Sequence, residues 1–173
     1  MEIYVLVERR KTIAYQFLGA LVLALTIICF FAAMAVYLMI IPTVALGCVW
    51  FFFFYHYSKE FEYTYFDGEV KFARIMNKSR RKNLYQYSLD DVIQIAPGGD
   101  RSVYKYENDN KILRKDMTSG VKGAPYYVFV VRDEKRGLML IKFEPDDRFL
   151  DAVEMRHMQK LIRMPKEAEE DAE

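Results

Sequence analysis

A long stretch without formal charge dominates the first third of the chain. No Asp, Glu, Lys or Arg occurs between Lys11 and Lys59, and most of the residues there are Leu, Ile, Val, Ala and Phe. A single helix of this length would measure roughly 70 Å, which is about twice the hydrocarbon thickness of a bilayer. Two membrane-spanning helices joined by a tight turn are therefore the better prediction.

Within this apolar region, 13–58, we place the first span near 13–36 and the second near 41–57. Pro42 suits the first turn of the second helix, because the N–H that proline lacks would have no helical partner there. The turn between the spans has little polar cover, so a shallow or re-entrant hairpin is the alternative. A cleavable signal peptide is disfavoured, since the run is too long and no small-residue cleavage motif closes a short apolar core.

The flanking charges predict the orientation of the two spans. The nearest basic residues are Arg9, Arg10 and Lys11 before the apolar region and Lys59, Lys71 and Arg74 after it. The turn between the spans carries no charge, and positive residues are retained on the cytoplasmic side. We therefore expect a multi-pass protein of the cell membrane with both its N- and C-termini in the cytoplasm. The aromatic run Trp50–Tyr55 fits an interfacial belt at the inner leaflet.

Composition excludes several classes of function. The 25 basic and 24 acidic residues give a net charge of +1, which argues against a nucleic-acid partner. The two cysteines, Cys29 and Cys48, both lie in the apolar region, so the rest of the chain has no disulfide framework and no cysteine zinc site. The spans contain no ionisable Asp, Glu, Lys or Arg, which disfavours a transporter or a channel.

After the apolar region, the hydrophobic period changes to two, as in a half-buried strand. Phe61, Tyr63 and Tyr65 alternate with polar residues, and Asp67-Gly68 then favours a tight hairpin turn. The predicted strands are 61–65, 69–76, 83–88, 92–96, 112–116, 126–132 and 138–143. The segment 101–123 is the hardest to assign, because Val103, Tyr104 and Tyr106 fit either a short helix or an edge strand.

One amphipathic helix is predicted at the end of the chain. Glu144-Pro145 opens it, and Asp146 and Asp147 suit the positive end of the helix dipole. Apolar or aromatic side chains recur at steps of three and four, at Leu150, Val153, His157, Leu161 and Met164. Pro165 ends the helix, and 165–173 is predicted to be an acidic, disordered tail.

These elements and their motifs resemble a known family. The strand pair Glu62-Tyr63-Thr64-Tyr65-Phe66-Asp67-Gly68-Glu69, the basic turn after Ile75 and the segment Tyr87–Pro97 are similar to a bacterial pleckstrin-homology-like (PH-like) domain. The chain resembles an uncharacterised family of small two-span membrane proteins of Gram-positive bacteria that carry this domain. The resemblance implies a fold and a topology but no activity.

The predicted fold class is therefore α+β. An N-terminal transmembrane helical hairpin is followed by a PH-like β-barrel or sandwich of about seven strands, capped by a C-terminal helix. We expect a cytoplasmic N-terminal segment at 1–12, the two spans at 13–58, a cytoplasmic PH-like domain at 60–164 and the tail at 165–173.

The sequence predicts no catalytic, cofactor-binding or metal-binding group of residues. The only histidines are His56, at the membrane boundary, and His157, on the apolar face of the last helix. The acidic pairs Asp90-Asp91 and Asp146-Asp147 are interpreted as a turn and a helix start. Pro97-Gly98-Gly99-Asp100 lacks the Lys-Ser/Thr pair of a phosphate-binding loop.

One basic group remains as a candidate site. It is predicted to contact anionic lipid and consists of Lys71, Arg74, Lys78, Arg80, Arg81 and Lys82. The alternative interpretation is a solvated turn that supports the membrane orientation. The leading hypothesis is a membrane-anchored, non-enzymatic module whose domain binds a protein partner or anionic lipid headgroups at the cytoplasmic face. The alternative hypothesis is a small structural subunit of a larger membrane complex, and an enzyme is the least favoured class.

Overall fold

The computed structural model describes residues 2–164 and divides the chain into two compact units. One unit is the apolar segment Arg10–Ser58. Within the described residues, the other combines 2–9 with 59–164. The predicted tail, 165–173, lies outside the described residues.

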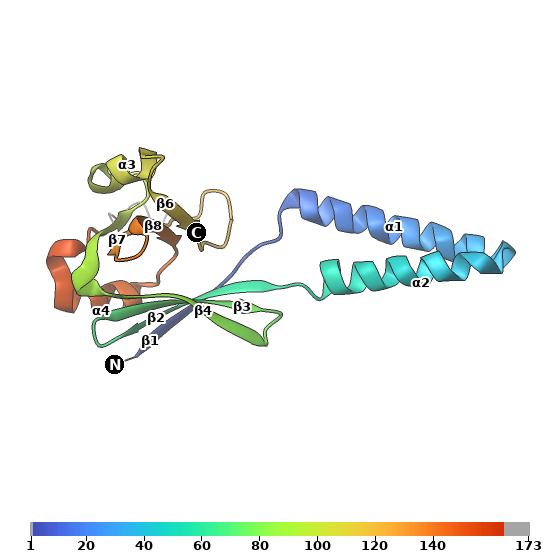
Figure 1. The fold of residues 1–173 in the computed structure, drawn as a ribbon, viewed down its shortest axis with the longest axis horizontal. Coiled ribbons are helices and arrows are strands. Elements are labelled where there is room, and N and C mark those ends of the chain that lie inside the picture. The colour runs from blue at the N-terminus through green and yellow to red at the C-terminus, as the bar shows by residue number, and fades with distance from the viewer. Residues whose placement is uncertain (1, 165–173) are drawn as a thin grey trace. The chain divides into compact units, whose positions relative to one another are not determined.

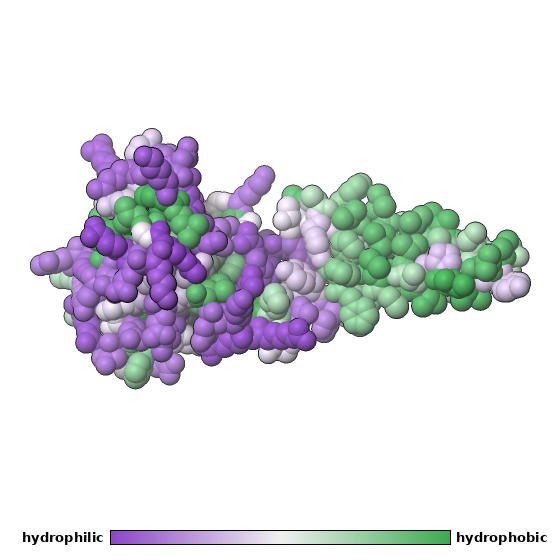
Figure 2. Space-filling model, viewed as in Figure 1, coloured by the Kyte–Doolittle hydropathy of each residue, from purple (hydrophilic) through white to green (hydrophobic). Residues whose placement is uncertain are grey.

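The apolar unit is a helical hairpin (Figure 1). Its elements are α1 (Ile13–Ala35), the 3₁₀ turn η1 (Tyr37–Met39), α2 (Ile40–Val49) and the π-helical turn η2 (Trp50–Tyr55). Two helical stretches, Ile13–Ala35 and Tyr37–Tyr55, are long and apolar enough to cross a membrane. Figure 2 shows that hydrophobic residues cover nearly all of the visible surface of this unit.

The two helices contact each other closely at the end where the chain enters and leaves the hairpin. A Cβ atom on Gly19 would lie 2.8 Å from Cδ1 of Phe54, so only glycine lets this aromatic ring approach. The last carbonyl groups of η2 have no helical partner of their own. They accept hydrogen bonds from the Tyr15 hydroxyl, at Phe53 O, and from Lys11 Nζ, at Phe54 O, the latter at 2.5 Å.

The second unit contains two four-stranded sheets. The first has the order β1-β2-β3-β4, and its strands are all antiparallel to their neighbours. Its strands are β1 (Ile3–Glu8), β2 (Lys59–Phe66), β3 (Glu69–Met76) and β4 (Arg80–Ser88). The second has the order β5-β7-β8-β6, with β6 parallel to β8. Its strands are β5 (Val92–Pro97), β6 (Leu113–Asp116), β7 (Tyr127–Asp133) and β8 (Gly137–Phe143).

Strand β1 is the main difference from the sequence analysis. No strand was predicted in the N-terminal segment 1–12, but Ile3–Glu8 pairs with β2 over its whole length. After the last pair, Glu8 with Glu60, the N–H of Arg9 donates to the carbonyl of Lys59 at 2.9 Å. The helical hairpin is therefore an insertion between two neighbouring strands of one sheet.

Turn chemistry sets the other connections of this sheet. Asp67 and Gly68 have positive φ angles of 48° and 84°, as the predicted hairpin turn requires. Asn77 and Lys78 also have positive φ angles, of 53° and 54°, between β3 and β4. The hairpin insertion and the Asn77-Lys78 turn lie at the same end of the sheet, because the register pairs Lys59 with Met76 and Met76 with Arg80.

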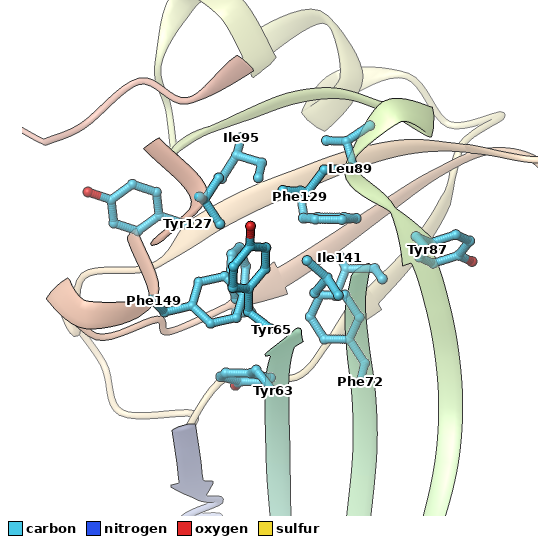
Figure 3. Close-up of a cluster of buried hydrophobic side chains, with 14 of the residues drawn as sticks. Tyr63, Tyr65, Phe72, Tyr87, Leu89, Ile95, Tyr127, Phe129, Ile141 and Phe149 are labelled. Atoms are coloured by element: carbon cyan, nitrogen blue, oxygen red, sulfur yellow. The ribbon is translucent and has the colours of Figure 1, made fainter. Parts of the chain in front are cut away.

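The main core lies between the inner faces of the two sheets (Figure 3). Fully buried aromatic rings from both sheets meet edge to face, among them Phe72 with Phe129 at 5.3 Å between ring centroids. Helix α4 (Asp147–His157) buries Phe149, Leu150 and Val153 against this core. Each edge-to-face aromatic pair in this core adds about 1 kcal/mol to the stabilisation that comes from burial of the rings.

The remaining elements complete the second sheet. Helix α3 (Arg101–Asn108) resolves the helix-or-strand alternative, and its Val103 joins a smaller apolar cluster with Val128, Val130 and Leu140. The 3₁₀ turns η3 (Leu89–Asp91) and η4 (Met158–Lys160) precede β5 and follow α4. Helix α4 ends earlier than predicted, and Leu161 instead bridges to Ile95 on β5.

The β1–β2 pairing predicts that the domain folds without its inserted helices. Replacing residues 10–58 with Asn-Gly should give a soluble protein with cooperative thermal unfolding, because Arg9 and Lys59 already face each other as in a two-residue hairpin. Circular dichroism during heating measures the cooperativity and the midpoint of thermal unfolding.

The matched control lacks residues 1–9 as well. It should be less stable by about 3 kcal/mol, because Ile3, Val5 and Val7 pack against the core. Equal stability of the two proteins would show that β1 is not an essential strand of the domain.

Candidate functional site

The predicted basic residues mostly gather at one end of the first sheet, here called the basic end. Its members from the sequence analysis are Arg74, Lys78, Arg80, Arg81 and Lys82. The register aligns Lys59 with Met76 and Arg80, and Phe61 with Arg74 and Lys82. At about 3.4 Å per residue, these rows all lie within roughly 10 Å of the end of the sheet where Arg9 and Lys59 join the inserted hairpin.

Lys71 does not belong to the basic end. It pairs with Thr64 and Gln86, five residues along β3 from Met76, which is a distance of roughly 17 Å. Its Nζ lies 3.9 Å from a carboxylate oxygen of Glu69. The structure therefore separates Lys71 from the other five predicted residues.

Arg81 has a structural partner. Its guanidinium lies 2.5 Å from Oε1 of Glu62, whose side chain is only 5% exposed. The same carboxylate oxygen accepts a hydrogen bond from Thr64. Arg81 compensates a buried carboxylate on the outer face of the sheet, and this limits its availability for a ligand.

Strand alternation sorts the charges at the basic end between the two faces of the sheet. The outer face carries Glu8, Glu60, Glu62 and Arg81, as the alternation around buried Phe61 requires. The inner face carries Lys59, Arg74, Arg80 and Lys82, which share the side of Phe61 and Met76. Arg9 joins this face through its contacts with Phe61 and with Asp116 of β6. Acidic groups therefore dominate the outer face and cations the inner face.

Two cations on the inner face lie over one aromatic ring, and a third is on the neighbouring strand. The guanidinium of Arg9 lies 5.8 Å, and the ammonium of Lys59 5.2 Å, from the centroid of Phe61. Arg9 also binds Asp116, with 3.0 Å between Nη2 and Oδ2. Arg74 completes the group, and its buried Nε has no hydrogen-bond partner among residues 2–164.

The electrostatics of this group act on Lys59. Burial, together with the positive charges of Arg9 and Arg74, lowers the pKa of Lys59, and Asp116 opposes this shift. Arg9 and Lys59 were interpreted from the sequence only as flanks of the membrane spans. Their positions on the inner face follow from the β1–β2 pairing, which no local sequence pattern reveals.

The residues considered for chemistry have structural roles. Ser88 Oγ accepts from the N–H of Asp90, in the turn η3, and Asp146 caps α4 by accepting from the N–H of Phe149. His157 Nε2 lies 3.9 Å from Asp90, and the ring of His56 stacks on Phe51. In the described part of the chain, no three His, Cys, Asp or Glu residues are grouped as metal ligands.

Comparison with known proteins identifies the class of protein. A family model described as Bacterial PH-like domain (DUF6106) matches residues 1–163. The chain belongs to this family, a bacterial PH-like domain of unknown function. The match confirms the expected PH-like class, and the two apolar helices and the C-terminal helix are present in the structure. Among residues 2–164 the structure has eight strands, where the sequence predicted about seven.

No curated protein and no solved structure matches the chain. Proteins with PH-like domains are generally non-enzymatic.

The pairing of Arg81 with Glu62 predicts unequal effects of two neighbouring substitutions. Arg81→Gln should lower the free energy of unfolding by about 1 kcal/mol, because the Glu62 carboxylate is buried and loses its cation. Solvent screening keeps the loss modest, since the Arg81 side chain is half exposed. Denaturant titration of the full-length protein in non-ionic detergent measures the difference.

Arg80→Gln is the matched control, because Arg80 makes no ion pair within the described residues. Its effect should stay within about 0.5 kcal/mol. If Arg80→Gln lowered the free energy of unfolding more than Arg81→Gln, the stabilising role of the Glu62–Arg81 pair would be contradicted.

Proposed function

We propose that this protein is a non-enzymatic, membrane-anchored module whose PH-like domain contacts anionic lipid headgroups with its basic end. One observation carries the proposal. The basic β3–β4 turn lies at the same end of the first sheet as Arg9 and Lys59, the two residues that join the apolar hairpin. Whatever the angle between the two units, chain connectivity keeps this end near the place where the hairpin begins and ends.

The β1–β2 pairing supports two membrane crossings. If only one of the two helices crossed a bilayer, Arg9 and Lys59 would be on opposite sides of a hydrocarbon layer about 30 Å thick. Their backbone N and O atoms are 2.9 Å apart. An even number of crossings returns the chain to its starting side, as this hydrogen bond requires.

Charge distribution supports a cytoplasmic domain. Arg9, Arg10, Lys11 and Lys59 flank the outer ends of the helices, and the turn η1 that joins the helices is uncharged. Short basic flanks are retained on the cytoplasmic side. The inner leaflet there is the anionic one, and a Lys or Arg near such a surface gains about 1 kcal/mol.

Three cations at the basic end fit a lipid contact best. Lys78, Arg80 and Lys82 are the members that take part in no ion pair within residues 2–164, and all three are exposed. Exposed cations with no carboxylate partner keep their charge available for phosphate groups. The alternatives that the experiments below can favour are binding of a protein partner at this end and a role as a structural subunit.

Labelling of an introduced cysteine tests the orientation. In a variant with Cys29→Ala and Cys48→Ala, Asn110→Cys places a thiol in an exposed loop of the domain. We expect a membrane-impermeant thiol reagent to label it only after the cells are broken. Labelling in intact cells would place the domain outside the cytoplasm and would overturn the proposed orientation.

Hydrogen exchange tests the lipid contact. The full-length protein is placed in nanodiscs of phosphatidylcholine alone or of phosphatidylcholine with phosphatidylglycerol. We expect amide exchange in 76–82 to slow in the anionic nanodiscs, and the double variant Arg80→Glu, Lys82→Glu to lose this protection.

Lys71→Glu is the control, since it makes the same kind of charge change on the first sheet, roughly 17 Å from the end. It should keep the protection seen in the original protein. Identical exchange in both lipids would overturn the lipid contact, and protection by a co-purifying protein instead would favour the protein-partner alternative.

A further inference from the structure

The inner face of the basic end contains a compact group of cations with too few anions. Arg9 and Lys59 lie over the ring of Phe61, and Arg74 lies in the same row as Phe61 on the neighbouring strand. We infer that Arg9, Lys59 and Arg74 together bind one phosphate monoester dianion. Three residues from three strands, β2, β3 and the end of β1, would converge on it.

The charge balance favours a bound anion. Asp116 is the carboxylate that reaches this group, and it already pairs with Arg9. Two of the three positive charges therefore have no counter-charge among the described ion pairs. A phosphate monoester carries a charge of about −1.5 to −2 at neutral pH, which matches this excess.

Hydrogen bonding points to the same conclusion. The Nε of Arg74 is buried and has no partner within residues 2–164, and a buried donor without a partner costs about 1–3 kcal/mol. The guanidinium fork of arginine fits two oxygens of a phosphate, and lysine adds a point charge. A phosphate bound at the guanidinium group of Arg74 would compensate its charge, and a small shift of the side chain would give its Nε an acceptor.

The lowered pKa of Lys59 agrees with this assignment. Burial and the neighbouring guanidinium groups of Arg9 and Arg74 lower the pKa of Lys59. A dianion placed among the three cations would reverse the repulsive part of this effect. Phe61 fixes the heads of Arg9 and Lys59 near one aromatic ring, at 5.8 and 5.2 Å from its centroid.

This inference rests on the proposed function for the source of its ligand, because a lipid headgroup reaches the site only if the basic end lies at the membrane. A phosphatidate headgroup and a soluble phosphate compound present the same monoester chemistry. The site residues differ from the lipid-facing residues Lys78, Arg80 and Lys82, so the two proposals fail separately.

Titration with inorganic phosphate in non-ionic detergent, without any bilayer, tests the site itself. We expect the full-length protein to bind phosphate in calorimetry, and its unfolding temperature to rise with phosphate but not with chloride at equal ionic strength. Arg74→Gln and Lys59→Gln should each weaken the affinity by about tenfold, since each removes a charge-assisted contact.

Lys71→Gln is the matched control, because it removes one positive charge from β3 outside the site, and it should leave the affinity unchanged. Circular dichroism checks that each variant folds, and Arg74→Lys, which keeps the charge but not the fork, should bind between the original protein and Arg74→Gln. No binding by the original protein, or equal weakening by Lys71→Gln, would overturn the site.

Nanodiscs distinguish the two sources of the phosphate. If the ligand is a lipid, phosphatidate should raise the unfolding temperature more than phosphatidylglycerol, a diester, and Lys59→Gln should abolish the difference. Phosphate binding in detergent with no preference for phosphatidate supports the site with a soluble ligand. If the original protein binds phosphate but its amides at 76–82 show no protection in anionic nanodiscs, the proposed lipid contact is wrong and the phosphate site is retained.

Discussion

The pairing of β1 with β2 is the constraint on which the rest of the structure depends. It brings residues from both sides of the apolar hairpin to one place and joins them through the Arg9–Lys59 hydrogen bond. It completes the first sheet and places Ile3, Val5 and Val7 against the core. Because Arg9 and Lys59 flank the apolar hairpin, the chain leaves the first sheet and re-enters it at the same end.

The same end of the sheet shows how strand alternation separates charge. Cations on the inner face and carboxylates on the outer face come from neighbouring residues of the same strands, such as Lys59 and Glu60. A shift in register by one residue would exchange the faces and bury the wrong charges. The Glu62–Arg81 pair compensates the buried carboxylate on the outer face, whereas the inner face keeps an excess of positive charge. The proposed phosphate site is a consequence of this asymmetry.

Much of the fold could be predicted because hydrophobicity, alternation and turn residues are properties of short segments of the sequence. The uncharged stretch indicated two apolar helices, and alternation after Phe61 indicated β2, while Asp67-Gly68 indicated its turn. Strand β1 was missed because its partner is about fifty residues away and its short sequence resembles a flank of the apolar region. The basic turn was found, but the sequence could not show that Lys71 lies apart or that Glu62 holds Arg81. Those facts depend on register, which the cross-strand contacts of the whole sheet determine.

The insertion of the hairpin between β1 and β2 also affects the order of synthesis. Strand β1 leaves the ribosome roughly 3–10 s before β2, since about fifty residues separate them and synthesis adds about 5–20 residues per second. During that interval β1 is an unpaired, largely apolar strand. Its sheet cannot close until both helices have been made and their ends brought together. Completion of the first sheet therefore waits for the whole apolar hairpin, and β1 stays without its partner until β2 has been made.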